Sequence, residues 1–188
     1  MTHQLLYLVF FGLLGLQPTP QKFVLEQQGS DLEILGTSTL HDWEITAEEM
    51  TGDASIALGD KMAVEALQFK VKVKSLESGK SSMNKNTYEA LKADKNPYIS
   101  YKLTEVKSIK NTGSAYKLET VGKLTIGGFT KTIPLTVDAK AGNAEVAFNG
   151  QITFKMSEYN IDPPTALMGT IKTGDEITIK FNVNYKNN

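Results

Sequence analysis

Nine residues near the end of the chain, ITIKFNVNY at 177–185, decide its fold class. Apolar residues hold every second position, and polar residues fill the positions between them. Side chains of a β-strand point alternately to its two faces, so this period of two predicts a strand with one buried and one solvated face. The segment LQFKVKVK at 67–74 repeats the pattern. We therefore expect an antiparallel sheet with an apolar inner face.

Weaker copies of the same alternation occupy much of the chain, at 43–48, 99–104, 116–126, 133–137 and 146–154. Turn-forming pairs stand between them, and both Gly127-Gly128 and Gly142-Asn143 predict tight hairpins. The pattern indicates roughly eight strands with short links, whose neighbours pair antiparallel. Closing such a sheet removes its exposed edges, and a barrel of about eight strands has room for side chains or one small ligand. The predicted fold class is an all-β, eight-stranded antiparallel barrel.

One segment, SSMNKNTYEALKA at 81–93, breaks this alternation. It places Met83, Tyr88 and Leu91 at helical spacings, with Ser81 or Ser82 available as the N-cap. Asn96-Pro97 ends the pattern, because the residue before a proline disfavours the helical conformation. We predict one short inserted helix at about residues 82–92. A second stretch without strand alternation covers 157–173.

The beginning of the chain predicts export. The run LLYLVFFGLLGL at 5–16 is uncharged, as the core of a signal peptide is. It is shorter than the roughly 20 residues that span a bilayer, and Pro18 and Pro20 follow it. We predict a signal peptide at 1–21, without fixing its cleavage site, then one barrel domain at 22–188. The expected location is periplasmic or secreted, without stable membrane insertion after processing. The alternative is a buried N-terminal helix.

The composition argues against several classes of function. Net charge is −1, there is no cysteine, and all 20 basic residues are lysine. Without arginine the chain lacks the bidentate fork that reads phosphates and base edges, which argues against a nucleic-acid partner. Without cysteine it has no thiolate metal ligand and no cysteine nucleophile. We expect no metal site and no catalytic cofactor.

The segment His41-Asp42-Trp43 is the most distinctive polar cluster. Apart from His3 in the predicted signal peptide, His41 is the only histidine, whereas a metal site needs several ligands. A serine triad would call for a G-x-S-x-G elbow, which the sequence lacks. We expect a structural role at the start of a strand, with contact to a ligand head group and catalysis as alternatives. Glu48-Glu49 is a poor carboxylate pair, because adjacent strand residues point to opposite faces. We predict that the protein is not an enzyme.

Four segments resemble the YceI-like family of polyisoprenoid-binding, lipocalin-like proteins. They are STLHDW at 38–43 followed by Gly52, the predicted helix with PYISY at 97–101, GKLTIGGFTK at 122–131, and Tyr159-Asn160-Ile161 with GDEI at 174–177. The similarity spans about residues 24–185. It implies an extended, lipocalin-like eight-stranded barrel that encloses a long isoprenoid chain or similar amphipathic lipid. Two positions depart from the pattern. Where the family often has an arginine, the nearest counterpart in this chain is Lys155, and Asn160 stands where the family has a glycine.

Given this resemblance, apolar residues on the inner faces of the strands become candidate ligand contacts. Three tyrosines beside loops, Tyr88, Tyr98 and Tyr159, are candidates for placing hydroxyl groups at the mouth, where an amphipathic head would lie. The predicted ligand-binding residues are Trp43, Ile45, Leu67, Phe69, Val71, Tyr88, Leu91, Tyr98, Tyr101, Leu103, Leu118, Leu124, Phe148, Phe154, Tyr159, Ile179 and Phe181.

The predicted function is carriage or storage of an apolar or amphipathic small molecule, an isoprenoid or other lipid, inside the barrel. One alternative is an exported structural or stress-related barrel without a physiological ligand. A hydrolase has the least support. The sequence leaves open which lipid is bound, whether the protein forms a homodimer, and which molecules donate or accept the ligand.

Overall fold

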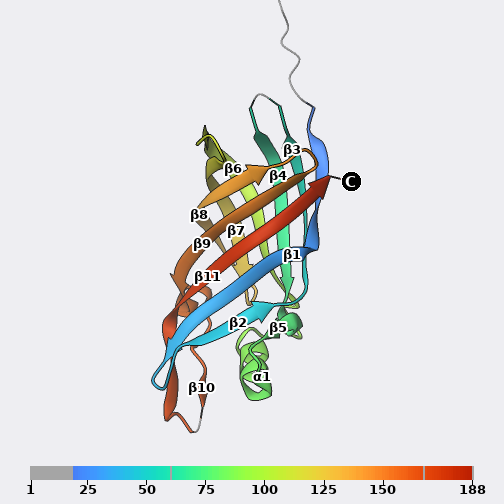
Figure 1. Ribbon diagram of the computed structural model, residues 1–188. Coiled ribbons are helices and arrows are strands. Elements are labelled where there is room, and N and C mark those ends of the chain that lie inside the picture. The colour runs from blue at the N-terminus through green and yellow to red at the C-terminus, as the bar shows by residue number, and fades with distance from the viewer. Residues whose placement is uncertain (1–18, 60, 167, 188) are drawn as a thin grey trace, which may run out of the picture.

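The computed structural model describes residues 19–59, 61–166 and 168–187. Residues 1–18, which hold most of the predicted signal peptide, lie outside the described residues. From Gln21 onward the chain forms one sheet that closes on itself, since its last strand pairs with its first (Figure 1).

Eight antiparallel strands make the barrel, and each is paired with two others around the circuit. This confirms the predicted fold class. In spatial order the strands are β1 (Gln21–Ser38), β3 (Met50–Ala57), β4 (Ala63–Lys72), β6 (Tyr98–Asn111), β7 (Tyr116–Ile126), β8 (Phe129–Ala141), β9 (Glu145–Lys155) and β11 (Ile171–Asn187).

Three short strands extend the sheet at the end of the barrel where the helix lies (Figure 1). β2 (Trp43–Ala47) pairs with the second half of β1, β5 (Leu76–Glu77) pairs with β2, and β10 (Thr165–Ala166) pairs with β11. Two 3₁₀ turns, η1 (Val73–Ser75) and η2 (Met156–Tyr159), lie at the same end. Strands of two residues are too short to show alternation, so β5 and β10 had no sequence signal.

The predicted helix is confirmed as α1 (Ser81–Ala90). Neither serine caps it. Lys80 holds the N-cap position with an extended backbone, and its carbonyl accepts hydrogen bonds from the amides of Met83 at 2.9 Å and Asn84 at 3.0 Å. The helix ends before Lys92, which has a left-handed φ of 53°. Only glycine, and less often asparagine, adopts that conformation without cost, so Lys92 marks a strained stop.

The turn between β7 and β8 is the tight hairpin that the sequence predicted. Gly127 and Gly128 both have positive φ, 56° and 87°, as a two-residue type I′ turn requires. Asn160, in place of the family's glycine, also adopts a left-handed φ of 52°. The asparagine therefore keeps the backbone conformation that the glycine would supply.

A bulge divides β1 into two parts with different partners. The register with β11 shifts between Glu26 and Asp31, where Gly29 has φ of 79°. Before the bulge β1 pairs with β3, and after it β1 pairs with β2. Buried residues change from odd to even positions across the bulge, from Leu25 to Leu32. One long strand thus serves both the barrel wall and the extension of the sheet.

The end of the barrel opposite the helix is filled by large side chains. Phe23, Ile56, Val146 and Tyr185 are each 0% exposed there. The Tyr185 ring meets Phe148 edge-on, with 5.8 Å between ring centroids. Its hydroxyl donates to the Gln68 carbonyl at 3.0 Å, so the polar atom is satisfied although it is buried.

We predict that Tyr185→Phe lowers the free energy of unfolding by about 1 kcal/mol, because the ring is retained while one buried hydrogen bond is lost. Urea unfolding followed by tryptophan fluorescence measures the change. Phe148→Leu is the comparison that keeps the hydroxyl and removes the aromatic contact. A Tyr185→Phe protein as stable as the wild type would show that this bond contributes nothing.

A candidate ligand-binding tunnel

The barrel encloses a cavity of about 120 Å³, which we call the upper cavity. Its lining is apolar apart from Thr120 and the hydroxyls of two tyrosines. Thr120 donates to the Leu135 carbonyl at 2.8 Å, Tyr101 lies 3.4 Å from the Thr120 hydroxyl, and Tyr185 is bonded as described above. Every polar group in the lining therefore has a protein partner. Such a cavity favours apolar chains over water.

A second cavity of about 360 Å³, the lower cavity, lies between the end of the barrel, α1 and the segment that holds β10. Trp43, Leu91 and Phe154 contribute apolar walls. Its rim residues Leu40 and His41 are exposed, so this cavity opens to solvent. The lower cavity thus forms the mouth of the barrel.

Three isoleucines, Ile34, Ile99 and Ile179, line both cavities. We call them the isoleucine constriction. They come from β1, β6 and β11, so the two cavities adjoin at these side chains. We refer to the two adjoining cavities together as the tunnel: the lower cavity opens at the mouth, and Tyr185 lines the upper cavity.

Two glycines let aromatic rings lie flat against neighbouring strands. A Cβ atom at Gly122 would fall 2.3 Å from the Tyr101 ring, and one at Gly150 would fall 3.0 Å from the Phe181 ring. Aromatic side chains often cover strand glycines in this way. Because the rings occupy the space above the glycines, they line the wall of the upper cavity without crossing it.

Most of the residues predicted from the sequence line the tunnel. The upper cavity holds Leu67, Phe69, Val71, Tyr101, Leu103, Leu118, Leu124, Phe148 and Phe181. The lower cavity holds Trp43, Ile45, Leu91 and Phe154, and Ile179 belongs to both. The period of two therefore brings these side chains together from strands that are far apart in the chain.

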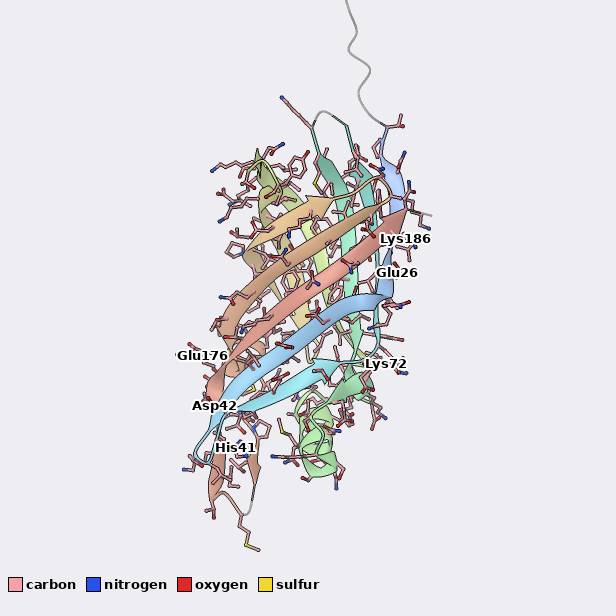
Figure 2. The ribbon with its side chains drawn as sticks, in the orientation of Figure 1. Glu26, His41, Asp42, Lys72, Glu176 and Lys186 are labelled. Atoms are coloured by element: carbon pink, nitrogen blue, oxygen red, sulfur yellow. The ribbon has the colours of Figure 1, made fainter. Side chains whose placement is uncertain are left out.

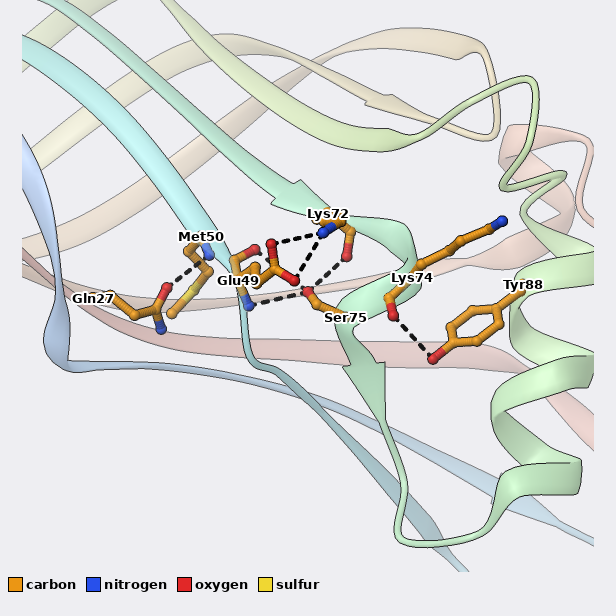
Figure 3. A network of polar contacts seen from close by, with 7 residues as sticks. All are labelled: Gln27, Glu49, Met50, Lys72, Lys74, Ser75 and Tyr88. Carbon is orange, nitrogen blue, oxygen red and sulfur yellow. Dashed lines mark hydrogen bonds and ion pairs between the residues drawn. The ribbon is translucent and has the colours of Figure 1, made fainter.

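The three tyrosines expected at the mouth line neither cavity. Tyr88 shares its hydroxyl hydrogen between the carbonyls of Leu76 at 2.9 Å and Lys74 at 3.2 Å, and Figure 3 shows the contact with Lys74. These bonds tie α1 to the segment at 74–76. Tyr98 is 50% exposed on the outer surface. Tyr159 is buried against Phe154, with 5.1 Å between ring centroids. Position beside a loop did not determine which way these side chains turn.

Glu49 takes part in a surface network and not in a carboxylate pair (Figure 3). It lies 2.8 Å from Lys72 Nζ, and this contact raises the pKa of Lys72. Ser75 donates to the Lys72 carbonyl at 2.8 Å and accepts from the Glu49 amide at 3.0 Å. These bonds hold the chain where β4 gives way to η1.

Sequence reasoning missed several lining residues for different reasons. Leu32 and Ile34 escaped because the bulge in β1 reverses the parity of its buried positions. Other strand residues stood on recognised apolar parities and could have been included: Ile99, Ile133, Leu135, Val137, Ile152, Val183 and Tyr185. The polar residues of the lower cavity come from the ends of strands, from a loop and from α1 with its N-cap, and only His41 among them was considered as a head-group contact: Ser38, His41, Lys80, Ser82, Asn86, Thr87, Thr165 and Thr173.

Within the described ranges, no helix is long and apolar enough to cross a membrane. Over the same residues, no group of three or more potential metal ligands comes together.

A closed antiparallel barrel with an apolar interior open at one end places the protein in the lipocalin-like structural class. The YceI-like domain family matches residues 23–185. The chain therefore belongs to the YceI-like family, as the resemblance of its motifs indicated. A search of curated proteins finds no match.

Solved structures share the fold. BcnA from Burkholderia cenocepacia is 20% identical, with a TM-score of 0.69 over 85% of this chain and 98% of that chain. A polyisoprenoid-binding domain from Saccharophagus degradans, implicated in plant cell wall breakdown, is 10% identical, with a TM-score of 0.69 over 88% and 98%. The Campylobacter jejuni YceI protein is 18% identical, with a TM-score of 0.58 over 77% and 84%.

Tyr159 generates a prediction on stability. It is 1% exposed, its hydroxyl has no hydrogen-bond partner among the described residues, and burial raises its pKa to about 12. A raised pKa favours the folded state below the unfolded value of about 10, and this stabilisation is lost as the pH rises from about 10 to 12. Tyr159→Phe should match or exceed wild-type stability at pH 7, because it removes a buried polar atom without a partner.

Between pH 10 and 12 the unfolding free energy of Tyr159→Phe should fall less steeply than that of the wild type, by up to about 1.4 kcal/mol per pH unit. Urea unfolding at pH 7, 10, 11 and 12 measures both effects. Tyr98→Phe, at an exposed position, is the control. A loss of more than about 1 kcal/mol at pH 7 would contradict the prediction, because it would reveal a hydrogen bond to this hydroxyl.

Proposed function

We propose that this protein binds an apolar or amphipathic molecule with a long isoprenoid-like or alkyl chain and encloses it in the barrel. The apolar tunnel carries the proposal. The lower cavity alone falls within the range of roughly 300–1,000 Å³ typical of small-molecule sites. The narrower upper cavity extends it with walls suited to a hydrocarbon tail. The Saccharophagus degradans relative is described as polyisoprenoid-binding, which supports the same ligand class here.

The energetics favour a ligand held by its chain. Each methylene moved from water into an apolar site contributes about 0.8 kcal/mol. Association costs roughly 4–15 kcal/mol of lost freedom, so about ten buried methylenes are comparable with that penalty. Affinity should therefore rise with chain length. The same tunnel offers a binding role without any catalytic step or catalytic cofactor.

Carriage or storage, in a periplasmic or secreted setting, is the role that we assign to this binding. The apolar run at 5–16 supports export. Exposed large apolar side chains support transfer at the mouth. Among the described residues they are Leu40, Tyr98, Phe129 and Met168, and all four stand in or beside connections at the helix end of the barrel. Exposed apolar residues can mark a contact surface, so this end of the barrel is the candidate site of transfer.

Organic extraction of the natively purified protein, followed by mass spectrometry, tests the proposal. We expect a stoichiometric molecule with a long apolar chain. Repeated extraction of no such molecule, together with no binding of added lipids, would instead favour a structural barrel without a ligand.

The constriction gives a sharper test. Ile179→Phe should block the passage to the upper cavity, so binding of a sixteen-carbon alcohol should weaken by about tenfold or more while an eight-carbon alcohol is affected little, given the contribution of each buried methylene. Displacement of N-phenyl-1-naphthylamine from the delipidated protein measures both affinities. Ile109→Phe is the matched control, because Ile109 is partly buried but lines neither cavity. Equal losses for both chain lengths would show that the tail does not pass the constriction.

A further inference from the structure

The polar side chains of the lower cavity have one sign of charge. Among the described residues that line it, only His41 and Lys80 are ionisable, and both are basic. Within the same described part of the chain, no aspartate or glutamate lines this cavity. Neutral donors complete the polar part of the wall, among them Ser82 and Asn86 of α1. A neutral lipid head would not require a lining that holds basic residues and no acidic ones.

Lys80 is available to a ligand. It makes no salt bridge with any described residue. Glu77 is the nearest acidic residue in the chain, but its carboxylate accepts hydrogen bonds at 2.7 Å from both Asn84 Nδ2 and the Gly79 amide. These bonds lower the pKa of Glu77, because they stabilise its carboxylate form. The Lys80 ammonium is therefore not paired with Glu77.

His41 also lines the lower cavity. Figure 2 places it at the lower end of the barrel, on the loop between β1 and β2. Its Nδ1 lies 2.6 Å from the Asp42 carbonyl oxygen. A carbonyl can only accept, so Nδ1 carries a hydrogen; in the neutral ring Nε2 is then an acceptor, and it has no hydrogen-bond partner among the described residues. The backbone bond also fixes the orientation of the ring.

We propose that the ligand is an anionic amphiphile whose oxyanion head, a carboxylate or phosphate, lies in the lower cavity near Lys80 while its tail extends toward the isoleucine constriction. This inference rests on the proposed function and names the class of molecule that the site takes. Hydrogen bonds from a charged donor to an oxyanion are about twice as strong as neutral ones. Ser82 and Asn86 supply further donors. The lining holds no carboxylate to repel the head.

Hexadecanoic acid and hexadecanol test the proposal, because they share a chain and differ in the charge of the head. Displacement of the neutral N-phenyl-1-naphthylamine from the delipidated protein at pH 8 and low salt gives both affinities. We expect the acid to bind about tenfold more tightly than the alcohol, as a charge-assisted hydrogen bond predicts. Hexadecyl phosphate, in a third arm, distinguishes a phosphate site from a carboxylate site.

Lys80→Gln should weaken binding of the acid by about tenfold and leave the alcohol within about twofold. Lys85→Gln is the matched control. Lys85 lies on the same helix, pairs with Glu89 at 3.8 Å and lines neither cavity. It removes one positive charge without altering the mouth, so the preference for the acid should persist. Thermal unfolding of each variant confirms that it is folded.

Each outcome bears on one claim. Equal affinity for acid and alcohol would overturn the anionic head and leave the proposed lipid-binding function intact. Failure of all three ligands to bind would overturn the proposed function itself. An equal loss of acid binding in Lys85→Gln and Lys80→Gln would also overturn the site, because it would reveal a general effect of net charge.

Discussion

Backbone pairing between β1 and β11 joins the two ends of the sheet, from Phe23 opposite Asn187 to Ser38 opposite Thr173. Without this seam the sheet would have two long exposed edges. With it, the alternation along each strand becomes a division between an apolar interior and a solvated exterior. The seam also brings β2 and the β10 segment to the same end, because β2 pairs with β1 and β10 pairs with β11.

The two ends of the resulting barrel differ in the side chains that they hold. At one end buried side chains such as Phe23 and Tyr185 fill the interior. At the other end the loop after β1, the start of α1 and the β10 segment leave an open cavity with a polar rim. Under the proposed function, an amphiphile would lie with its head in the lower cavity and its tail toward the upper cavity. The strand glycines contribute to this arrangement, since they let aromatic rings lie along the wall.

Much of the fold and of the apolar lining could be predicted because both follow from a local rule. In a strand, positions of equal parity share a face, so ITIKFNVNY identified Ile179 and Phe181 without knowledge of their neighbours. The rule failed where the backbone departs from regularity. The bulge near Gly29 reversed the parity of β1 and concealed Leu32 and Ile34. The parity rule also does not predict the orientation of Tyr88, whose hydroxyl donates to two backbone carbonyls and does not line the mouth.

By itself the sequence determined the strands, their tight turns, the inserted helix and the types of site that its composition excludes, because alternation, turn residues and missing side-chain chemistries are local properties of the chain. The tertiary structure alone decided the width of the tunnel and the composition of its mouth. His41 belongs to a loop and Lys80 to a helix N-cap, nearly forty positions later in the chain. They line one cavity because β2 pairs with both β1 and β5, and no pattern along the chain encodes that meeting.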